Sequence, residues 1–315
     1  MPSPRDHSML VRAATLYYLD GKSQAEVAAD IGVSRSNVSR VLADARKLGI
    51  VEIRVNAPAA RASELERGLV ERFGLRDARV AAGGDDDNRL ARVGELGARW
   101  LLEHLPESGA LALSWGATVQ AVVDAMPESL EHPRLEVLPL VGGLSIVDSA
   151  QDGNVLVRLL ASKLGAKHRR LYAPAVVESA ESRQTFMNEP SIRDVLRSSR
   201  AAKVALVGIG SVGSGASAAI VESMRLSPDE AARFAASGVV GDCCTRFFDA
   251  NGSLVDQPVN ERVIAIDLDD LRTIPTVVGV AAGSRKATAT ASALAGGLFD
   301  VLVVDADLAS ALLED

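Results

Sequence analysis

The sequence predicts an α/β protein in two parts: an N-terminal all-α domain and a large domain built on a mainly parallel sheet. Three observations predict this fold class. Residues 8–48 show helical apolar spacing, the rest of the chain alternates short apolar runs with helical stretches, and no period of 20–50 residues recurs. Strands of about four to seven residues separated by helices are typical of βαβ units. The length of 315 residues suits two domains.

The N-terminal domain is predicted to contain three helices, each with its own start or stop signal. The first covers residues 8–19, where apolar side chains recur at helical spacing, and Gly21 ends it. Ser23 and Glu26 form a capping box that starts the second helix, which stops at Gly32. Ser34 can cap a third helix over residues 35–48, and Gly49 ends it.

The second and third helices fit a helix-turn-helix. Ala28 is small where the helices would cross, and Gly32 can supply the positive φ of the turn. One apolar face is formed by Val27, Ile31, Val38 and Val41. The polar side chains suited to base edges and phosphates are Ser34, Arg35, Ser36, Asn37, Ser39, Arg40, Arg46 and Lys47. An ordinary αα-hairpin with a solvated polar face is the alternative.

Charge is distributed unevenly between the two parts. Residues 1–56 hold eight Lys and Arg against six Asp and Glu, a net charge of +2, whereas the whole chain carries −7 and the remainder therefore −9. A basic N-terminal domain on an otherwise acidic chain is compatible with DNA binding through that domain alone. Because its positive charge is small, we expect DNA affinity to come from two N-terminal domains that bind one symmetric operator together.

The larger domain is predicted from its alternating elements. A strand over 50–55 and a linker over 57–60 place the domain boundary between residues 1–56 and 57–315, and a connecting helix follows over 61–73. Further strands are expected over 78–82, 109–114, 135–140, 168–172, 204–209, 237–243, 262–266, 276–282 and 300–304. Helices are expected over 89–105, 118–126, 152–164, 191–199, 228–236, 268–272, 284–295 and 306–314.

Several classes of protein and site are disfavoured. No run of 18 apolar residues and no signal peptide is found, so we expect a cytoplasmic protein without membrane contact. The four histidines lack metal spacing, and Cys243 and Cys244 read as two packed thiols, so neither metal nor redox chemistry is expected. Residues 208–213 satisfy G-x-G-x-x-G, but no acidic strand end follows at the distance a dinucleotide site needs. We therefore expect no cofactor.

Three glycine turns at strand-to-helix junctions could cradle a phosphate. They contain Gly116 with Thr118, Gly142-Gly143, and Gly283 with Lys286. Glycine lets backbone amides approach an anion, a helix N-terminus favours it, and Lys286 adds a counter-charge. The alternatives are that these glycines only form turns, that Lys286 is a solvated helix residue, and that Asp242 is a buried cap.

With these motifs in place, the chain resembles the SorC family of sugar-binding transcriptional regulators. The resemblance spans the whole chain and includes the helix-turn-helix. Its segments are SWGATV (114–119), LPLVGGLS (138–145), YAPAVV (172–177), ALVGIGS (205–211), GVVGDCCTRFFDANG (238–252), RVIAIDLDDLRTIPTVVGVAAGSRKA (262–287) and GGLFDVLVVDADLASALL (296–313).

The resemblance implies a sugar-phosphate isomerase-like, Rossmann-type effector domain that binds a phosphorylated sugar. It also implies homo-oligomers, tetramers or dimers, with operator affinity controlled by the effector. The pocket residues it implies or that the turns suggest are Gly116, Thr118, Gly142, Gly143, Asn154, Asp242, Gly283 and Lys286. Some members carry an arginine at the second turn, and its absence here argues against a ligand with a second phosphate.

Two functions compete at this point. The first is a DNA-binding regulator of a carbohydrate operon, with repression relieved by the effector as the expected arrangement and activation as the other. The second is an isomerase-like enzyme with Asp242 as base and Lys286 on the phosphate. An isomerase has no use for the N-terminal domain, so we expect a regulator and not an enzyme.

Overall fold

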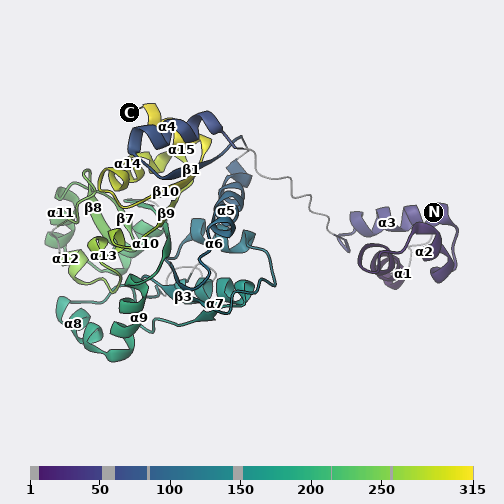
Figure 1. Cartoon of the computed structure of the whole chain (residues 1–315), viewed down its shortest axis with the longest axis horizontal. Coiled ribbons are helices and arrows are strands. Elements are labelled where there is room, and N and C mark those ends of the chain that lie inside the picture. Colours follow the sequence, from purple (N-terminus) through teal and green to yellow (C-terminus); the bar gives the residue numbers. More distant parts are fainter. Residues whose placement is uncertain are drawn as a thin grey trace. The chain divides into compact units, whose positions relative to one another are not determined.

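The protein divides into two compact units, Met1–Pro58 and Ala59–Asp315. The computed structural model describes residues 7–51, 61–83, 86–144, 152–213, 215–255 and 258–314 (Figure 1). Among these residues, no helix has the length and apolar character needed to cross a bilayer.

The N-terminal unit is a small helical domain with its own core. Its helices are α1 (His7–Ala14), a π-helical turn (Thr15–Leu19), α2 (Gln24–Ile31) and α3 (Arg35–Lys47). The predicted capping box is present, because Ser23 Oγ accepts from the Glu26 amide while Glu26 accepts from the Ser23 amide. Gly32 has φ 71° and ends α2. The buried residues are Leu10, Ala13, Ala14, Val27, Ala28, Val38, Val41, Leu42 and Ala45.

Three local predictions in this unit need correction. The first helix is α-helical only to Ala14, after which the Asp20 amide donates to the Thr15 carbonyl five residues back and widens the last turn. Ser34 occupies the N-cap position, but its hydroxyl lies 3.1 Å from the Ser36 hydroxyl and caps no helix amide. Residues 50 and 51 form no strand, and the rest of the predicted strand at 50–55 lies outside the described residues.

A seven-stranded parallel sheet forms the centre of the larger unit. The strand order is β1-β10-β9-β5-β2-β3-β4, and each neighbouring pair is parallel, so the predicted fold class is confirmed. Residues of β5 and β10 are buried along nearly their whole length, as expected for strands covered on both faces. The strands are β1 (Asp77–Ala81), β2 (Gly109–Leu113), β3 (Leu135–Pro139), β4 (Lys167–His168), β5 (Val204–Gly208), β9 (Val277–Val280) and β10 (Val301–Asp305).

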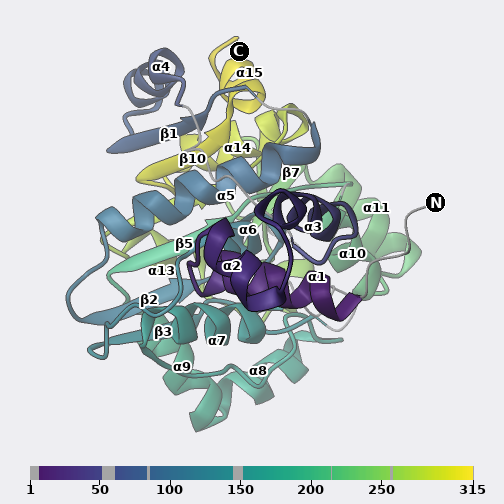
Figure 2. The ribbon, with the colours of Figure 1, turned by 90° about the vertical axis from the view of Figure 1, so that its right-hand side faces the viewer.

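Helices cover both faces of this sheet. Figure 2 shows α5, α6 and α7 over one face, where they pack against β1, β5 and β3. Helices α9 and α15 pack against the sheet elsewhere, α9 on β3 and β2, and α15 on β10 and α4. The helices are α4 (Ser63–Phe73), α5 (Asp86–Glu103), α6 (Ala117–Ala125), α7 (Gly153–Leu164), α8 (Ala180–Asn188), α9 (Pro190–Arg200), α10 (Gly215–Ser223), α11 (Pro228–Ala236), α12 (Pro258–Glu261), α13 (Leu268–Arg272), α14 (Ala287–Ala295) and α15 (Ala306–Glu314), with a 3₁₀ turn at Ser284–Lys286.

The strand order reverses direction between β2 and β5. From β2 the chain proceeds outward to β3 and β4, then returns through α9 to place β5 on the other side of β2, followed by β9 and β10. The connections that follow β2 and β5 therefore run in opposite directions from the boundary between these two neighbouring strands. In open α/β sheets a crevice at the carboxyl ends of such strands is where ligands bind.

The strand predictions fail where long-range pairing decides the outcome. The strand expected over 237–243 exists as β7 (Val239–Cys243), but it belongs to a separate antiparallel sheet with β6 (Gly210–Ser211) and β8 (Arg246–Asp249). Residues 262–266 make only isolated bridges, and the segment is apolar because it is buried without being a strand. The strand expected over 168–172 is reduced to the end of β4. Helices α8, α10 and α12 have no counterpart among the predicted helix ranges.

The crossing of α5 and α6 depends on glycine. A Cβ on Gly94 would lie 2.4 Å from the Ala121 carbonyl oxygen, and one on Gly97 would lie 2.6 Å from Val122 Cγ2. Two helix backbones can approach this closely only where one of them has no side chain.

Gly94→Ala is therefore expected to lower the free energy of unfolding by about 1–3 kcal/mol through overpacking, although alanine favours helix by about 1 kcal/mol over glycine. Urea unfolding measures the change. Gly68→Ala is the matched control, because its Cβ would meet only the movable end of Leu313, at 2.9 Å. Equal stability of the two variants would contradict the proposed close crossing.

Candidate functional site

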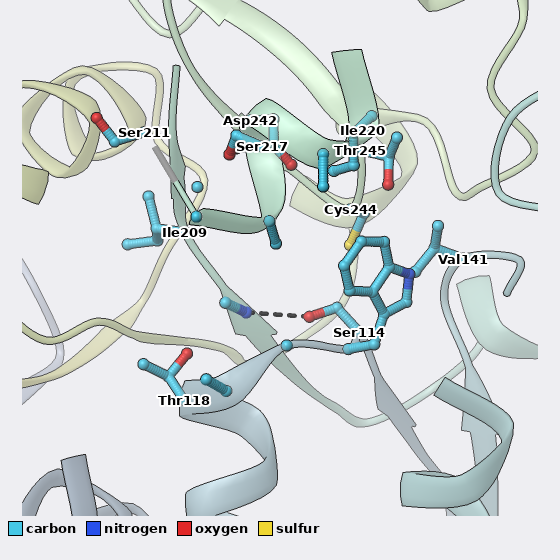
Figure 3. Close-up of a pocket in the computed structure, with 18 of the residues that line it drawn as sticks. Ser114, Thr118, Val141, Ile209, Ser211, Ser217, Ile220, Asp242, Cys244 and Thr245 are labelled. Carbon is cyan, nitrogen blue, oxygen red and sulfur yellow. Dashed lines mark hydrogen bonds between the residues drawn. The ribbon is translucent and has the colours of Figure 1, made fainter. Parts of the chain in front are cut away.

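A cavity of about 460 Å³ opens at the carboxyl ends of β2 and β5, where the strand order reverses. Its walls come from five places in the chain. Figure 3 shows the turn after β2, the end of β5 with β6, the start of α10 and the β7–β8 turn, and the fifth is the 3₁₀ turn before α14. The lining residues with polar side chains are Ser114, Trp115, Thr118, Ser211, Ser217, Asp242, Thr245 and Lys286.

The turn after β2 forms the floor of the cavity. Ser114 Oγ accepts a hydrogen bond of 3.0 Å from the Gly208 amide, which joins the ends of β2 and β5 (Figure 3). Gly116 has φ 119°, a conformation that L side chains rarely adopt, and caps the N-terminus of α6. Thr118 lies in the first turn of α6. The free amides of a helix N-terminus favour an anion, so this wall suits a phosphate.

Asp242 provides the carboxylate of the cavity. It lies on β7 opposite Gly210 of β6 and is only 6% exposed. One carboxylate oxygen accepts from Ser217 Oγ, and the Thr245 amide also donates to the carboxylate (Figure 3). Burial raises the pKa of Asp242 above its ordinary value, although the hydrogen bonds from Ser217 and Thr245 and the charge of Lys286 oppose the shift.

The glycine pattern at residues 208–213 has a packing role. A Cβ on Gly210 would lie 2.0 Å from Asp242 Oδ1 and 2.1 Å from Ser217 Oγ, so only glycine leaves room for this hydrogen bond. A Cβ on Gly208 would come within 3.3 Å of Thr118 Oγ1. The two glycines thus allow β5, α6 and β7 to converge on the cavity.

Lys286 provides the cation. It is half-buried, and burial lowers the pKa of its ammonium group, while the charges of Asp242 and Asp305 oppose this shift. Within the part of the chain that the structure describes, no carboxylate lies within 4.0 Å of its nitrogen. The ammonium and the Asp242 carboxylate therefore face the same cavity without being joined in an ion pair.

The structure gathers only half of the predicted pocket residues. Gly116, Thr118, Asp242 and Lys286 line the cavity, and the remaining four do not. Asn154 is used elsewhere, because its side chain forms two hydrogen bonds with the Leu171 backbone.

The other two glycine turns have their amides occupied. The Gly142 and Gly143 amides donate to the carbonyls of Ile264 and Ala173, and the Gly283 amide donates to Asp305 Oδ1 at 2.7 Å. In this arrangement they cannot also bind a phosphate, so the phosphate-cradle interpretation applies to the Gly116 turn alone.

Ser217 and Thr245 are cavity residues that sequence reasoning missed. Ser217 follows the 208–213 glycine pattern at the start of a helix, which was a usable signal. Thr245 gave none, because the two-residue β7–β8 turn, Cys244-Thr245, has φ of 52° and 65° where Asn or Gly is the usual choice.

The helix-turn-helix presents the polar face expected of α3. Ser34, Arg35, Ser36, Ser39, Arg40, Arg46 and Lys47 are exposed, and Asn37 is half-buried. They lie on the side of α3 away from the buried Val38, Val41, Leu42 and Ala45. No metal cluster of His, Cys, Asp or Glu is found among the described residues, and Cys243 and Cys244 are buried free thiols.

The buried Asp242 makes stability depend on pH. Because its folded-state pKa is raised, the carboxyl contributes stability that is fully present below its unfolded pKa and is lost as the pH rises through the folded pKa. Asp242→Asn is therefore expected to raise the Tm at pH 7, and the gain should shrink towards zero as the pH falls through the carboxyl range. Thermal unfolding from pH 4 to pH 8 measures this, with the exposed Asp124→Asn as control. A Tm gain that grows at low pH would contradict the assignment.

Comparisons with known proteins agree with this architecture. Residues 57–314 match a family model described as a sugar-binding domain. The sorbitol operon regulator of Klebsiella pneumoniae is 31% identical over 320 residues, covering 100% of both chains. The transcriptional regulator LsrR of Escherichia coli is 32% identical over 309 residues, covering 98% of this chain and 95% of LsrR.

Solved structures give the same result. The crystal structure of the full-length sorbitol operon regulator SorC from Klebsiella pneumoniae matches with a TM-score of 0.74 and 30% identity, covering 97% of this chain and 98% of SorC. A DeoR family transcriptional regulator from Listeria monocytogenes matches with a TM-score of 0.71 and 30% identity, covering 79% of this chain and 98% of that chain. Family model, full-length relatives and fold coincide, and the chain therefore belongs to the SorC family of sugar-binding transcriptional regulators.

Proposed function

We propose that the protein is a repressor of a carbohydrate operon and that a phosphorylated sugar, bound in the cavity at the ends of β2 and β5, releases it from its operator. The main support for this proposal is that a single cavity contains a lysine, a buried carboxylate and a helix N-terminus. Lys286, Gly116 and Thr118 suit the phosphate, and Asp242 suits sugar hydroxyls.

The same cavity favours binding over turnover. As an isomerase base, Asp242 would need a carboxylate oxygen directed at the substrate carbon. Here the carboxylate is held by Ser217 Oγ and the Thr245 amide, and the described lining contains no histidine to act as a second acid or base. Prolonged incubation with candidate sugar phosphates, followed by product analysis, would reveal any isomerase activity.

The N-terminal unit supplies the DNA contact in this proposal. Its α3 face carries the exposed arginines and hydroxyls suited to a major groove. Residues 1–56 have a net charge of only +2, so one N-terminal unit alone should bind DNA weakly. We propose that a homo-oligomer, a dimer or a tetramer, binds one symmetric operator in the cytoplasm with two of its N-terminal units.

The full-length protein and its own promoter DNA test this function. Operator binding is followed by fluorescence anisotropy while phosphorylated sugars and their unphosphorylated forms are titrated. We expect a phosphorylated sugar to weaken operator binding and its unphosphorylated form to have no effect. If no phosphorylated sugar changes operator affinity, the proposal is wrong; if one strengthens it, the repressor-release arrangement is wrong.

We expect operator binding to weaken in each of two variants, Arg35→Ala and Arg40→Ala. The expected loss is about 1–3 kcal/mol for each N-terminal unit that loses a bidentate base contact. Arg67→Ala is the control, because it removes an exposed arginine on α4 of the larger unit. Anisotropy with the operator and with scrambled DNA of equal length measures affinity and specificity. If both variants bind the operator as tightly as the control does, α3 is not the helix that contacts the bases.

A further inference from the structure

A second buried carboxylate, Asp305, holds the turn that carries Lys286. It is the last residue of β10, only 4% exposed, and is not among the residues that line the cavity. Its Oδ1 accepts a hydrogen bond of 2.7 Å from the Gly283 amide, and the Gly283 carbonyl accepts one of 3.0 Å from the Lys286 amide. A movement of the Lys286 turn therefore acts directly on Asp305.

The other carboxylate oxygen of Asp305 is not satisfied. Oδ2 is buried and accepts no hydrogen bond from the described residues. Arg89 Nε lies 3.1 Å away, close enough for an ion pair but not aligned for a hydrogen bond, while Arg89 Nη2 donates to Asp307 at 2.6 Å. A buried acceptor without a donor is costly. Asp305 thus has a second arrangement within reach, in which a small shift aligns Oδ2 with Arg89 Nε.

The same end of β10 is joined to the segment that leads to the N-terminal unit. Asp305 pairs with Ala81 of β1, and Ala81 forms an antiparallel bridge with Arg61, the first described residue of the larger unit. Figure 2 shows α4, β1, β10 and α15 together. Because neighbouring strands lie about 4.8 Å apart, Arg61 and Asp305 are roughly 10 Å apart across this pairing.

Arg61 is fixed to β1 through the buried carboxylate of Glu66. Its guanidinium donates twice, from Nε to Oε1 at 2.8 Å and from Nη2 to Oε2 at 2.7 Å, and Glu66 is only 6% exposed. Glu66 Oε1 also accepts from the Val80 amide at 2.9 Å, and the Ala62 amide donates to the Val80 carbonyl at 3.0 Å. A displacement of the end of β1 is therefore passed on to Arg61 and Ala62.

We propose that Asp305 is a positioning residue that couples binding of an anion at Lys286 to the segment Arg61–Ala62, and through this segment to the N-terminal unit. This inference rests on the proposed function and adds the residues that transmit the signal. An anion bound to Lys286 draws the turn and Gly283 toward the cavity. Asp305 follows through its hydrogen bond, its Oδ2 comes into line with Arg89 Nε, and the ends of β10 and β1 move together.

Hydrogen exchange of the full-length protein tests this coupling without DNA. Exchange over residues 61–82 is followed by mass spectrometry with and without excess inorganic phosphate, ribose 5-phosphate, glucose 6-phosphate or glucitol 6-phosphate. We expect at least one of these anions to change exchange of the Ala62 and Val80 amides, and Asp305→Asn to abolish the change. Asparagine can still accept from the Gly283 amide, but its NH₂ group cannot accept from Arg89.

Isothermal titration verifies that Asp305→Asn still binds the anion, which is expected because the substitution removes a negative charge near Lys286. Three results would overturn the inference. They are no exchange response in the wild type, an equal response in Asp305→Asn, and loss of anion binding in that variant.

Arg61→Met tests the far end of the coupling, because Arg61 does not line the cavity. Coupling is measured as the ratio of operator dissociation constants with and without the sugar phosphate that weakens operator binding most. We expect this ratio to fall about 2- to 30-fold, with sugar-phosphate affinity in the absence of DNA unchanged. The double variant with Asp305→Asn should lose no more than the larger single loss, because both changes interrupt one route.

Arg76→Met is the matched control. Arg76 precedes β1 and pairs at 3.2 Å with Asp300, which precedes β10, so it joins the same two strands at their opposite end. Its coupling ratio should remain at the wild-type value, and Tm values verify that all variants are folded. An equal fall in Arg76→Met and Arg61→Met would indicate general loosening of the sheet and contradict the proposed route.

The outcomes separate this inference from the proposed function. If exchange at Ala62 responds through Asp305 but no sugar phosphate changes operator affinity, the coupling within the larger unit stands and the regulatory function fails. If a sugar phosphate releases the operator equally well from Asp305→Asn and from the wild type, the function stands and the role of Asp305 is wrong.

Discussion

Lys286→Met is expected to weaken binding of a phosphorylated effector on the order of 100-fold, because removing one charged partner of a desolvated pair costs about 2–5 kcal/mol. Lys286 is the only cation among the described cavity residues, and burial already lowers the pKa of its ammonium group. A bound phosphate would restore the favourable environment for the positive charge. Methionine keeps the aliphatic stem, so the change isolates the charge.

Titration of the effector into the full-length variant measures the loss, and anisotropy with operator DNA measures its consequence. Operator affinity without effector should stay at the wild-type value, since Lys286 belongs to the larger unit. Arg285→Met is the control: it removes the adjacent exposed cation, which does not line the cavity. An equal loss in both variants would indicate general electrostatic attraction instead of a direct phosphate contact.

Features encoded over a few residues were predictable from the sequence. The capping box of Ser23 and Glu26 and the left-handed Gly32 depend only on neighbours in the chain, and the structure has both. The buried strands β5 and β10 were equally evident, because a strand covered on both faces must be apolar at consecutive positions.

The candidate site was only half predictable, because glycine turns after strands look alike in the sequence. Whether their amides are free depends on segments far along the chain. The amides of Gly142 and Gly143 are occupied by carbonyls of residues 264 and 173, whereas the Gly116 turn stays at the cavity. The antiparallel sheet was missed for the same reason. Gly210 pairs with Asp242, which lies 32 residues later in the chain, and no sequence pattern near either residue indicates this pairing.

Arg246 fixes the β7–β8 turn that delivers Asp242 and Thr245 to the cavity. The residue is 2% exposed, and Nη2 lies 2.6 Å from Asp267 Oδ1. Its guanidinium also donates to the Asn260 carbonyl at 2.7 Å and to the carbonyls of residues 265 and 266, both at 3.3 Å. Burial lowers the pKa of Arg246, and the charge of Asp267 opposes the shift. The network ties the turn to the segment that precedes α13.

Arg246→Met is expected to destabilise the protein by about 3–5 kcal/mol, because three carbonyls lose the buried guanidinium that donates to them and each unsatisfied buried acceptor costs about 1–3 kcal/mol. Asp267 is half-exposed and keeps Arg183 and Arg200 at 4.0 Å, so the loss of its pair with Arg246 adds little. At about 2–4 °C per kcal/mol for a unit of this size, the Tm should fall by roughly 6–20 °C. Arg197→Met is the control, because its pair with Asp194 is a surface contact with a side chain 70% exposed, worth at most about 1 kcal/mol. Effector affinity measured well below the variant's Tm should also fall, since the turn loses its support. A stable variant with wild-type affinity would show that the turn's left-handed conformation is maintained without Arg246.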